Sequence, residues 1–249
     1  VGGAGGIAPP AATAAAFALG AAYVMTGSVN QGCREAGTSD AVREMLAQAR
    51  STDVAMAPAA DMFELGVEVQ VLARGTMFAA RARKLHEIYR AHDSIDALPP
   101  AVRAELEEKY FRCSLEEAWR ECAAFFRERD PAQIERAERE PKHKLALVCR
   151  SYLGRSSGWA NEGVPDRRLD YQVWCGPAMG AFNDWARGSF LERWEARRVV
   201  PIARNLLVGA AYLARIAALR AQGVILPADL ERFAPREEAE LDRLCAAVS

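Results

Sequence analysis

The fold is decided by residues 1–28, VGGAGGIAPPAATAAAFALGAAYVMTGS, which have the pattern of a strand, a glycine-rich turn, a helix and a second strand. Pro9 and Pro10 suit a first helical turn, where a missing N–H group is tolerated. The alanine-rich residues 11–20 favour a helix that a glycine closes. Tyr23–Met25 is a short apolar run, typical of a buried parallel strand. The stretch therefore predicts a compact βαβ unit.

A turn of small residues follows each of the two predicted strands. Free backbone N–H groups in such turns, and at the start of the helix, can bind a phosphate group. Glycine suits these turns because it adopts positive φ and lets the backbone approach a ligand closely. The candidate phosphate ligands are Gly3, Gly5, Gly6, Thr26, Gly27 and Ser28.

Three interpretations of these turns compete. Gly3, Gly5 and Ala8 fit the G-x-G-x-x-A form of the dinucleotide fingerprint, which needs an acid at the end of the next strand. The first acid after that strand is Glu35, so the fingerprint is incomplete. In a (β/α)8 barrel, the loops after the seventh and eighth strands hold one phosphate together. We favour the barrel; a glycine turn that only packs a helix on a sheet is the remaining alternative.

The barrel interpretation has consequences for the whole chain. Val1 would lie within a buried strand and the other six strands would precede it, so we expect the C-terminal part of a longer polypeptide or one half of a broken one. The predicted fold class is α/β. We assign residues 1–55 to the last two strands of an FMN-binding TIM barrel and residues 56–249 to a large, mainly helical substrate domain. Within that domain, residues 67–72 alternate like a strand and Ser114 opens a capping box.

Composition restricts the class of protein. The 249 residues are 51% hydrophobic with a net charge of −1, which argues against disorder and against an electrostatic nucleic-acid partner. The six cysteines and three histidines lack zinc-ligand spacing, and we predict no metal site. The apolar run 14–25 is too short to span a membrane. We therefore expect a soluble, cytoplasmic protein with reduced thiols.

Three separated blocks carry a resemblance to a known family. They are residues 5–31, GGIAPPAATAAAFALGAAYVMTGSVNQ; residues 57–89, APAADMFELGVEVQVLARGTMFAARARKLHEIY; and residues 170–185, DYQVWCGPAMGAFNDW. In this order they resemble the trans-acting enoyl reductases of bacterial trans-acyltransferase polyketide synthases. They also resemble the PfaD enoyl reductase of polyunsaturated fatty acid synthases. Both families belong to the nitronate monooxygenase (2-nitropropane dioxygenase) group of FMN barrels.

The resemblance implies a flavoprotein of polyketide, antibiotic or polyunsaturated fatty acid biosynthesis. Such an enzyme reduces the α,β double bond of an enoyl thioester carried on acyl carrier protein, with FMN as cofactor and NADPH or NADH as hydride donor. The implied partners are the carrier protein and its synthase, and a homodimer is left open. The matching phosphate-binding positions are Gly5, Gly6, Thr26, Gly27 and Ser28. In related barrels, the strands that contact the isoalloxazine ring and a histidine would lie before Val1. The catalytic residues are therefore unknown, and the chain alone is expected to have little activity.

Two other functions are weighed against the reductase. One is a nitronate monooxygenase, whose small substrates leave a large helical domain unexplained. The other is a non-catalytic module that binds carrier protein. Asn30 and Gln31 could reach FMN or substrate amides, or could be solvated loop residues.

The aromatic block 170–185 offers a cysteine and an apolar wall. Cys175 as a nucleophile is disfavoured, because no histidine is near it in sequence and hydride transfer through a flavin needs no thiolate. Packing between the helical domain and the barrel explains the aromatic residues better. A weaker hypothesis places Trp174 in the wall of an acyl-chain channel.

Histidine and basic residues complete the candidates. The isolated His86, His92 and His143 are predicted to be solvated. Two basic clusters could dock an acidic carrier protein, although charge runs are usually solvated surface. The clusters are Arg81, Arg83 and Lys84, and Lys142, His143, Lys144 and Arg150.

Overall fold

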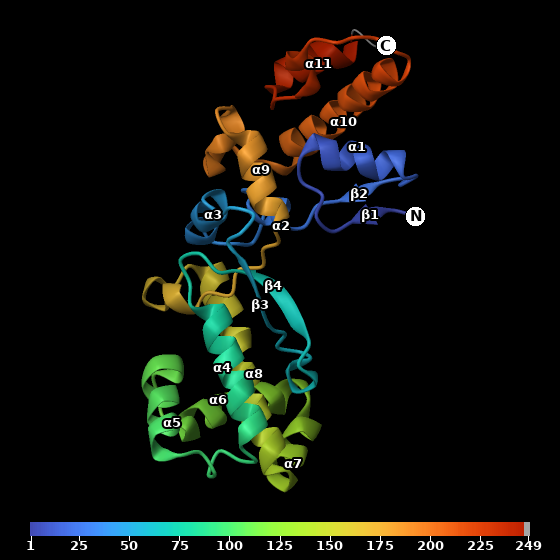
Figure 1. Cartoon of the computed structure of the whole chain (residues 1–249). Helices are drawn as coiled ribbons and strands as arrows, with labels where there is room; N and C mark the ends of the chain where they lie inside the picture. The colour runs from blue at the N-terminus through green and yellow to red at the C-terminus, as the bar shows by residue number, and fades with distance from the viewer. Residues whose placement is uncertain (247–249) are drawn as a thin grey trace. The chain divides into compact units, whose positions relative to one another are not determined.

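The computed structural model describes residues 1–246, and internal contacts divide the chain into two compact units (Figure 1). Unit 1 comprises residues 1–54 and 174–249, and unit 2 comprises residues 55–173. Unit 2 is thus an insertion between two segments of unit 1. The contacts group the C-terminal segment with the N-terminal one and not with the helical unit; the assignment of residues 1–55 to a barrel part and 56–249 to a substrate domain stays a prediction.

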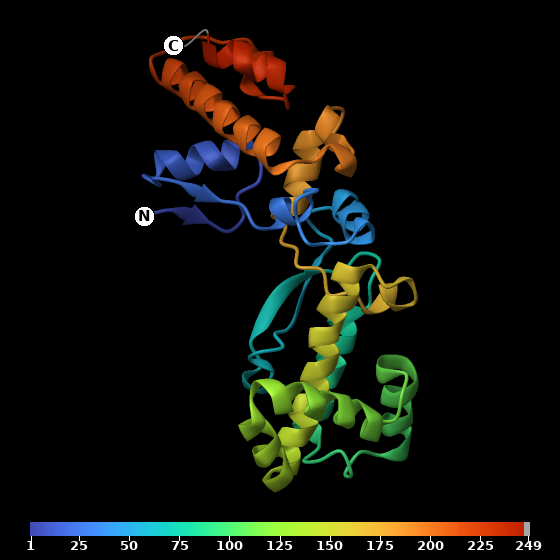
Figure 2. The same ribbon diagram turned by 180° about the vertical axis from the view of Figure 1, so that it is seen from behind.

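Unit 1 is built around the βαβ unit predicted from residues 1–28. Strands β1 (Gly3–Ala4) and β2 (Val24–Met25) pair in parallel, and α1 (Pro10–Ala18) connects them. Figures 1 and 2 show α1 lying along α10 (Val199–Ala221), which is why the C-terminal segment belongs to this unit. The remaining elements of unit 1 are α2 (Ser28–Gln31), α3 (Asp40–Ala47), α9 (Ala178–Ala186), the short 3₁₀ helices η4 (Phe190–Glu192), η5 (Trp194–Ala196) and η6 (Ala228–Glu231), and α11 (Glu238–Ala246).

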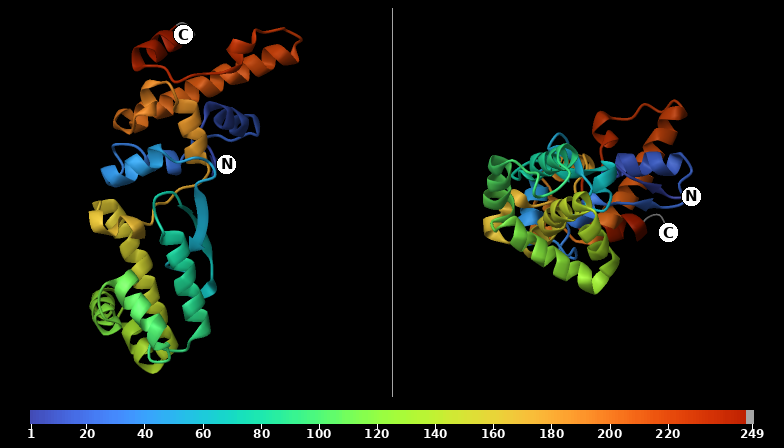
Figure 3. Two further views of the ribbon diagram at one scale, coloured as in Figure 1. Left: turned by 60° about the vertical axis from the view of Figure 1, so that its left-hand side comes forward. Right: turned by 90° about the horizontal axis from the view of Figure 1, so that it is seen from below.

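Unit 2 is mainly helical around two long helices. Helices α4 (Phe78–Ala91) and α8 (Pro141–Glu162) run side by side (Figure 3). Strands β3 (Val54–Pro58) and β4 (Glu68–Leu72) pair with each other, and β3 begins at the unit boundary. The other elements are η1 (Phe63–Leu65), α5 (Pro100–Glu105), the π-helical turn η2 (Leu106–Phe111), α6 (Leu115–Arg129), α7 (Pro131–Arg139) and the 3₁₀ helix η3 (Pro165–Asp170).

Helix caps follow the sequence signals. Ser114 accepts a hydrogen bond from the Glu117 N–H group, which confirms the predicted N-cap. Thr38, Ser39 and Asp40 are candidate caps for the helix that runs to about Arg50, and the structure selects Ser39, which accepts from the Val42 N–H group. Gly163 ends α8 at φ 71°, a conformation that a side chain would disfavour. The sequence indicates a loop over residues 161–169, but the loop is shorter, because α8 extends to Glu162 and η3 begins at Pro165.

Two elements differ from the sequence prediction. β3, with the sequence VAMAP, was not expected, since alanine and proline have low strand propensity. α9 forms from part of the aromatic block, which is otherwise extended. The α/β class with mostly helical content is confirmed; the TIM barrel assignment stays a prediction. The end predicted for the last helix, Val248, lies outside the described residues.

Helix α10 has an unusual composition. Among residues 1–246 it is the one helix long and apolar enough to cross a bilayer by length and composition alone. Core helices of globular proteins meet the same criterion, so this property does not by itself assign α10 to a membrane. Its contacts with α1 and α11 are those of a packed helix.

Candidate functional site

The two small-residue turns are neighbours in unit 1. Gly3 lies opposite Val24 and Ala4 opposite Met25 in the parallel pair. Both turns therefore leave the same edge of the sheet, and adjacent strands are separated by about 4.8 Å. This spacing is compatible with one small anion between the two turns. The structure thus brings together the two turns that the sequence analysis assigned to a single site.

The backbone in these turns is available to a ligand. Gly5 and Gly6 have φ values of 82° and 70°, and a Cβ on either residue or on Gly27 would meet no atom within 4 Å. Within residues 1–246, the amide N–H groups of Gly5, Gly6, Gly27 and Ser28 have no hydrogen-bond acceptor. Exposed N–H groups on consecutive residues with glycine conformations form an anion-binding concavity. These four amides fit a phosphate group.

The start of α1 contributes less than expected. Pro9 and Pro10 have no N–H group, and the amides of Ala12 and Thr13 both donate to the Pro9 carbonyl. The amides of Ala12 and Thr13 are therefore not available to a phosphate, which contradicts the hypothesis for these two residues. Of the first helical turn, only the Ala11 amide could still bind it.

Gly3 has a packing role. Its amide donates to the Tyr23 carbonyl at 2.8 Å within the sheet. A Cβ at Gly3 would lie 3.4 Å from the Cβ of Ala16 and 3.5 Å from the Ile7 side chain. These are ordinary van der Waals distances, so Gly3 lies at the contact of α1 with β1, and its amide is not available to an anion.

Ser28 links the second turn to the aromatic block. The Ser28 hydroxyl oxygen accepts a hydrogen bond from the Gly176 amide at 2.9 Å, while its own proton remains able to donate to a ligand. Thr26 donates to the side-chain oxygen of Asn30 at 2.9 Å, which fixes the same turn. No pattern in the sequence indicates that residues 148 positions apart meet here.

Arg197 is a residue of this unit that the sequence analysis missed. It is 1% exposed, and its guanidinium donates to the carbonyls of Leu191 and Glu192 at 2.9 and 3.2 Å. Burial lowers its pKa to about 10, and its Nη1 atom has no hydrogen-bond partner within the described part of the chain. The Arg197 carbonyl accepts from the Arg34 amide at 2.9 Å. Arg197 thereby fixes the segment that follows α2. That its guanidinium is buried could be inferred only from the tertiary structure.

Cys175 has the properties of a structural thiol. It is 3% exposed, and burial, together with the charge of Asp53, raises its pKa to about 12. The thiol is therefore protonated at neutral pH, whereas a nucleophile needs the thiolate. This agrees with the interpretation that disfavours a cysteine nucleophile.

Alkylation is expected to reflect this burial. Burial raises the pKa of Cys33, Cys149 and Cys175 to about 12 and that of Cys122 to about 11. Iodoacetamide at pH 8 is therefore expected to modify the exposed Cys245 first, and the four buried thiols only after unfolding in urea. Peptide mass spectrometry measures this, with a C245S variant to identify the first adduct. An adduct on Cys175 in the folded chain would contradict the prediction.

The aromatic block is divided between the units: residues 170–173 belong to unit 2, and residues 174–185 pack within unit 1. Phe182 and Met179 on α9 are fully buried, and the Trp185 indole donates to the Phe233 carbonyl at 2.7 Å. Trp174 is 40% exposed, so it is the residue of this block with a large free surface. Its role in an acyl-chain channel stays a prediction.

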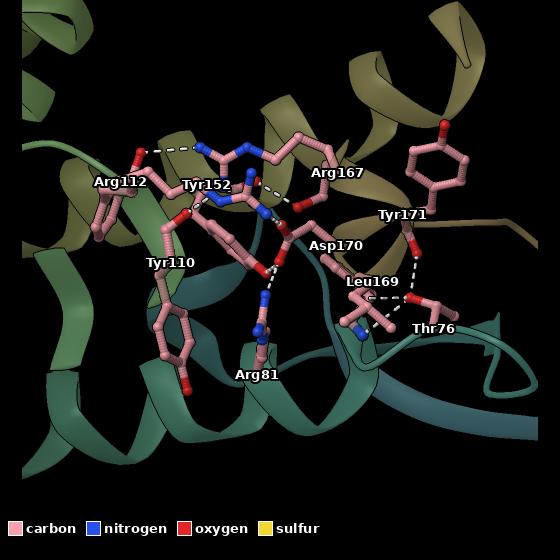
Figure 4. A network of polar contacts seen from close by, with 12 residues as sticks. Thr76, Arg81, Tyr110, Arg112, Tyr152, Arg167, Leu169, Asp170 and Tyr171 are labelled. Atoms are coloured by element: carbon pink, nitrogen blue, oxygen red, sulfur yellow. Dashed lines mark hydrogen bonds and ion pairs between the residues drawn. The ribbon is translucent and has the colours of Figure 1, made fainter. Parts of the chain in front are cut away.

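A buried polar network lies in unit 2 around Asp170 (Figure 4). The Asp170 carboxylate is fully buried and forms an ion pair with Arg81, a hydrogen bond with the Tyr152 hydroxyl at 2.6 Å and a contact with Arg167 at 3.3 Å. Arg112 lies 3.8 Å away. Burial and the hydrogen bond to Asp170 raise the pKa of Tyr152, so its hydroxyl is a neutral donor.

The same network fixes the end of the insertion. Arg167 also donates to the carbonyls of Tyr110 and Phe111 at 2.7 and 2.9 Å. The Thr76 hydroxyl lies 3.1 and 2.9 Å from the carbonyls of Leu169 and Tyr171 (Figure 4). Arg81 lies on α4, Tyr152 on α8 and the carbonyls of Tyr110 and Phe111 on η2, so the network holds η3 against these three elements.

His143 corrects the prediction of three solvated histidines. It is 2% exposed, with Nδ1 3.1 Å from Glu64 and Nε2 2.8 Å from Gln133. The sequence prediction was wrong because the carboxylate lies 79 residues away. His86 packs edge-on against Phe63.

The basic clusters are largely engaged within unit 2. Lys142 donates to the carbonyls of Tyr89 and His92, and Arg150 donates to the Ala60 carbonyl. Lys144 lies over the Trp119 ring, and Arg81 pairs with Asp170. Of the two predicted clusters, Arg83 and Lys84 remain exposed. Docking of a carrier protein by these residues stays a prediction.

The chain is similar to known proteins in both sequence and structure. Residues 92–171, within unit 2, match the family described as [acyl-carrier-protein] S-malonyltransferase, inserted helical domain. The chain is 49% identical over 225 residues to a polyunsaturated fatty acid synthase subunit from Thraustochytrium sp., covering 88% of this chain and 15% of that protein. It is 50% identical over 214 residues to the polyketide biosynthesis protein ThaF of Burkholderia thailandensis, covering 86% of this chain and 18% of that protein.

The chain is therefore homologous to segments of polyketide and polyunsaturated fatty acid biosynthesis proteins. Among solved structures, it is similar to the enoyl reductase domain of MlnA from the macrolactin biosynthesis cluster of Bacillus amyloliquefaciens, with a TM-score of 0.83 and 39% identity. That match covers 88% of this chain and 49% of the MlnA chain, so the chain spans about half of that structure and smaller shares of the two synthesis proteins. The resemblance inferred from the three sequence blocks is confirmed.

Proposed function

We propose that this chain forms the phosphate-binding part of an FMN-dependent enoyl reductase in polyketide or polyunsaturated fatty acid biosynthesis. The observation that carries the proposal is the pair of adjacent turns with four available amides at residues 5, 6, 27 and 28. The similarity to the MlnA enoyl reductase domain supports the reaction class.

The chemistry that FMN supplies when bound is hydride transfer from NADPH or NADH to the β-carbon of an enoyl thioester. The amides of Gly5 and Gly6, with those of Gly27 and Ser28, would hold its phosphate. The Ser28 hydroxyl orients the Gly176 segment beside that phosphate, and Arg197 fixes the chain that follows α2. The remaining reductase groups are not assigned.

Acyl carrier protein is the proposed bearer of the substrate. Residues 92–171 match the inserted helical domain of [acyl-carrier-protein] S-malonyltransferase. This match supports a role for unit 2 in binding substrates attached to acyl carrier protein. Arg83 and Lys84 are the cations of the predicted clusters that remain available to an acidic partner.

Replacing Gly27 by aspartate tests the phosphate site. The new carboxylate would stand beside the phosphate and repel it. Gly27 has a φ of −95°, which aspartate adopts without strain, and a Cβ there meets no atom within 4 Å, so the local fold should be preserved. We expect the variant to bind FMN at least tenfold more weakly, measured by quenching of flavin fluorescence. Riboflavin, which has no phosphate, should bind both chains equally.

A matched control is Gly37→Asp, because Gly37 is exposed in the same unit and its Cβ would also meet no atom within 4 Å. This variant should retain FMN affinity. Equal FMN affinity of wild type and Gly27→Asp, or no saturable FMN binding by the chain, would contradict the assigned phosphate site.

Substrate assays separate the three candidate functions. Oxidation of NADPH that depends on an enoyl thioester supports the reductase. Turnover of an alkyl nitronate in place of the thioester would instead indicate a nitronate monooxygenase. Because the chain alone is expected to have little activity, carrier-protein binding by a chain that binds no FMN would indicate the non-catalytic module.

A further inference from the structure

Unit 2 contains a groove that the proposed reductase does not use. Helix α6 contributes Glu121, Cys122, Phe125 and Phe126, and α8 contributes Arg150, Ser151, Gly154 and Arg155. Within each helix these positions have i, i+1, i+4, i+5 spacing, which places them on one face. Ala60 and Asp61, which precede η1, complete a cavity of about 600 Å³. This volume lies in the range of small-molecule sites.

The floor and walls of the groove are apolar. Gly154 leaves open space, since a Cβ there would meet no atom within 4 Å. Cys122 is buried, and its thiol is directed to the Leu147 carbonyl. Phe125 is 50% exposed at the edge of the groove and meets Phe126 edge-on at 5.2 Å. A large exposed aromatic ring beside an apolar cavity indicates a surface that gains from being covered.

Positive charge is available at the same edge. The Arg129 guanidinium lies 4.0 Å from the Phe125 ring centroid, and it has no carboxylate partner within residues 1–246. Arg155 pairs with Glu121, but their side chains are 35% and 48% exposed. Glu121 neutralises Arg155 and lines the groove together with Asp61, so Arg129 is the cation left for a ligand carboxylate. Arg150 is held instead by the Ala60 carbonyl and Glu64.

We propose that this groove binds a linear aliphatic chain with an anionic head, such as a fatty acyl carboxylate. The tail would lie along Gly154 between Phe126 and Cys122. The head would reach Arg129 at the edge marked by Phe125. This site lies wholly within unit 2, and its occupancy does not depend on the proposed reductase activity.

Gly154→Leu tests the groove. Leucine is a better helix former than glycine, so the variant should keep α8 folded while its side chain fills the cavity. Decanoate is expected to bind the wild-type chain saturably in isothermal titration calorimetry, below its micellar concentration. We expect Gly154→Leu to bind it at least tenfold more weakly. Gly158→Leu is the matched control, because Gly158 also lies on α8 in open space but does not line the groove.

Two further arms test the chemistry of the head group. Decan-1-ol has a similar tail without charge and should bind the wild type several-fold more weakly than decanoate. Arg129→Ala should bring decanoate down to the level of decanol. The proposal is overturned if decanoate does not bind, if Gly154→Leu and Gly158→Leu bind it equally, or if decanol binds as tightly as decanoate. Concentration-dependent self-association that Gly154→Leu alone abolishes would assign the groove to a second copy of the chain, and would also overturn it.

Discussion

Replacing Asp170 by alanine is expected to lower the free energy of unfolding by about 3–5 kcal/mol, because removal of one partner leaves buried charges uncompensated. Arg81 and Arg167 both direct guanidinium groups at this fully buried carboxylate, and their side chains are only 14% and 11% exposed. The Tyr152 hydroxyl would lose its acceptor as well. Urea unfolding followed by circular dichroism measures the loss, and hydrogen exchange of the α8 amides assigns it to unit 2.

Asp166→Ala is the matched control for this prediction. Asp166 also pairs with an arginine of unit 2, Arg112, at 2.9 Å, but its side chain is 71% exposed. Surface pairs contribute about 0–1 kcal/mol, so the control should unfold almost as the wild type does. Equal stability of the Asp170 and Asp166 variants would show that the Asp170 network does not hold η3.

The sequence was most informative where local chemistry determines local structure. The glycine, proline and alanine pattern of residues 1–28 was sufficient for β1, α1 and β2, and the parallel pairing followed from the short crossover. Ser114 with Glu117 predicted the start of α6 correctly. In these cases the controlling residues lie within a few positions of the element that they form.

Tertiary contacts decided what the sequence could not. The packing of α10 on α1, and of α9 on α2 and α3, shows that residues 174–246 belong with the N-terminal segment. His143 is buried because Glu64 meets it from 79 residues away. In the candidate site, the two turns were predicted from composition, but the Ser28–Gly176 hydrogen bond and the buried Arg197 depend on segments that are distant in sequence.

Replacing Gly180 by alanine is expected to destabilise unit 1 by about 3 kcal/mol, because overpacking against rigid backbone costs about 1–3 kcal/mol and sometimes more. A Cβ at this position would lie 1.9 Å from the Ser51 nitrogen and 2.3 Å from the Arg50 carbonyl carbon. Neither atom can move without shifting the segment after α3. The Asn183 amide donates to the carbonyls of Leu46 and Ala49 at 2.8 and 2.7 Å, which holds α9 against this segment one turn further along.

The direction of this effect distinguishes packing from helix propensity. Alanine in place of glycine inside a helix normally stabilises it by about 0.5–1 kcal/mol. Gly158→Ala on α8, where the added methyl group meets open space, is expected to show that gain. Gly180→Ala should have the opposite sign in the same urea titration, since the contact with residues 50 and 51 outweighs propensity. If both variants are stabilised, the close approach of α9 to residues 50 and 51 is wrong. The packing that anchors α9, which follows the Ser28–Gly176 contact in the chain, would then be wrong as well.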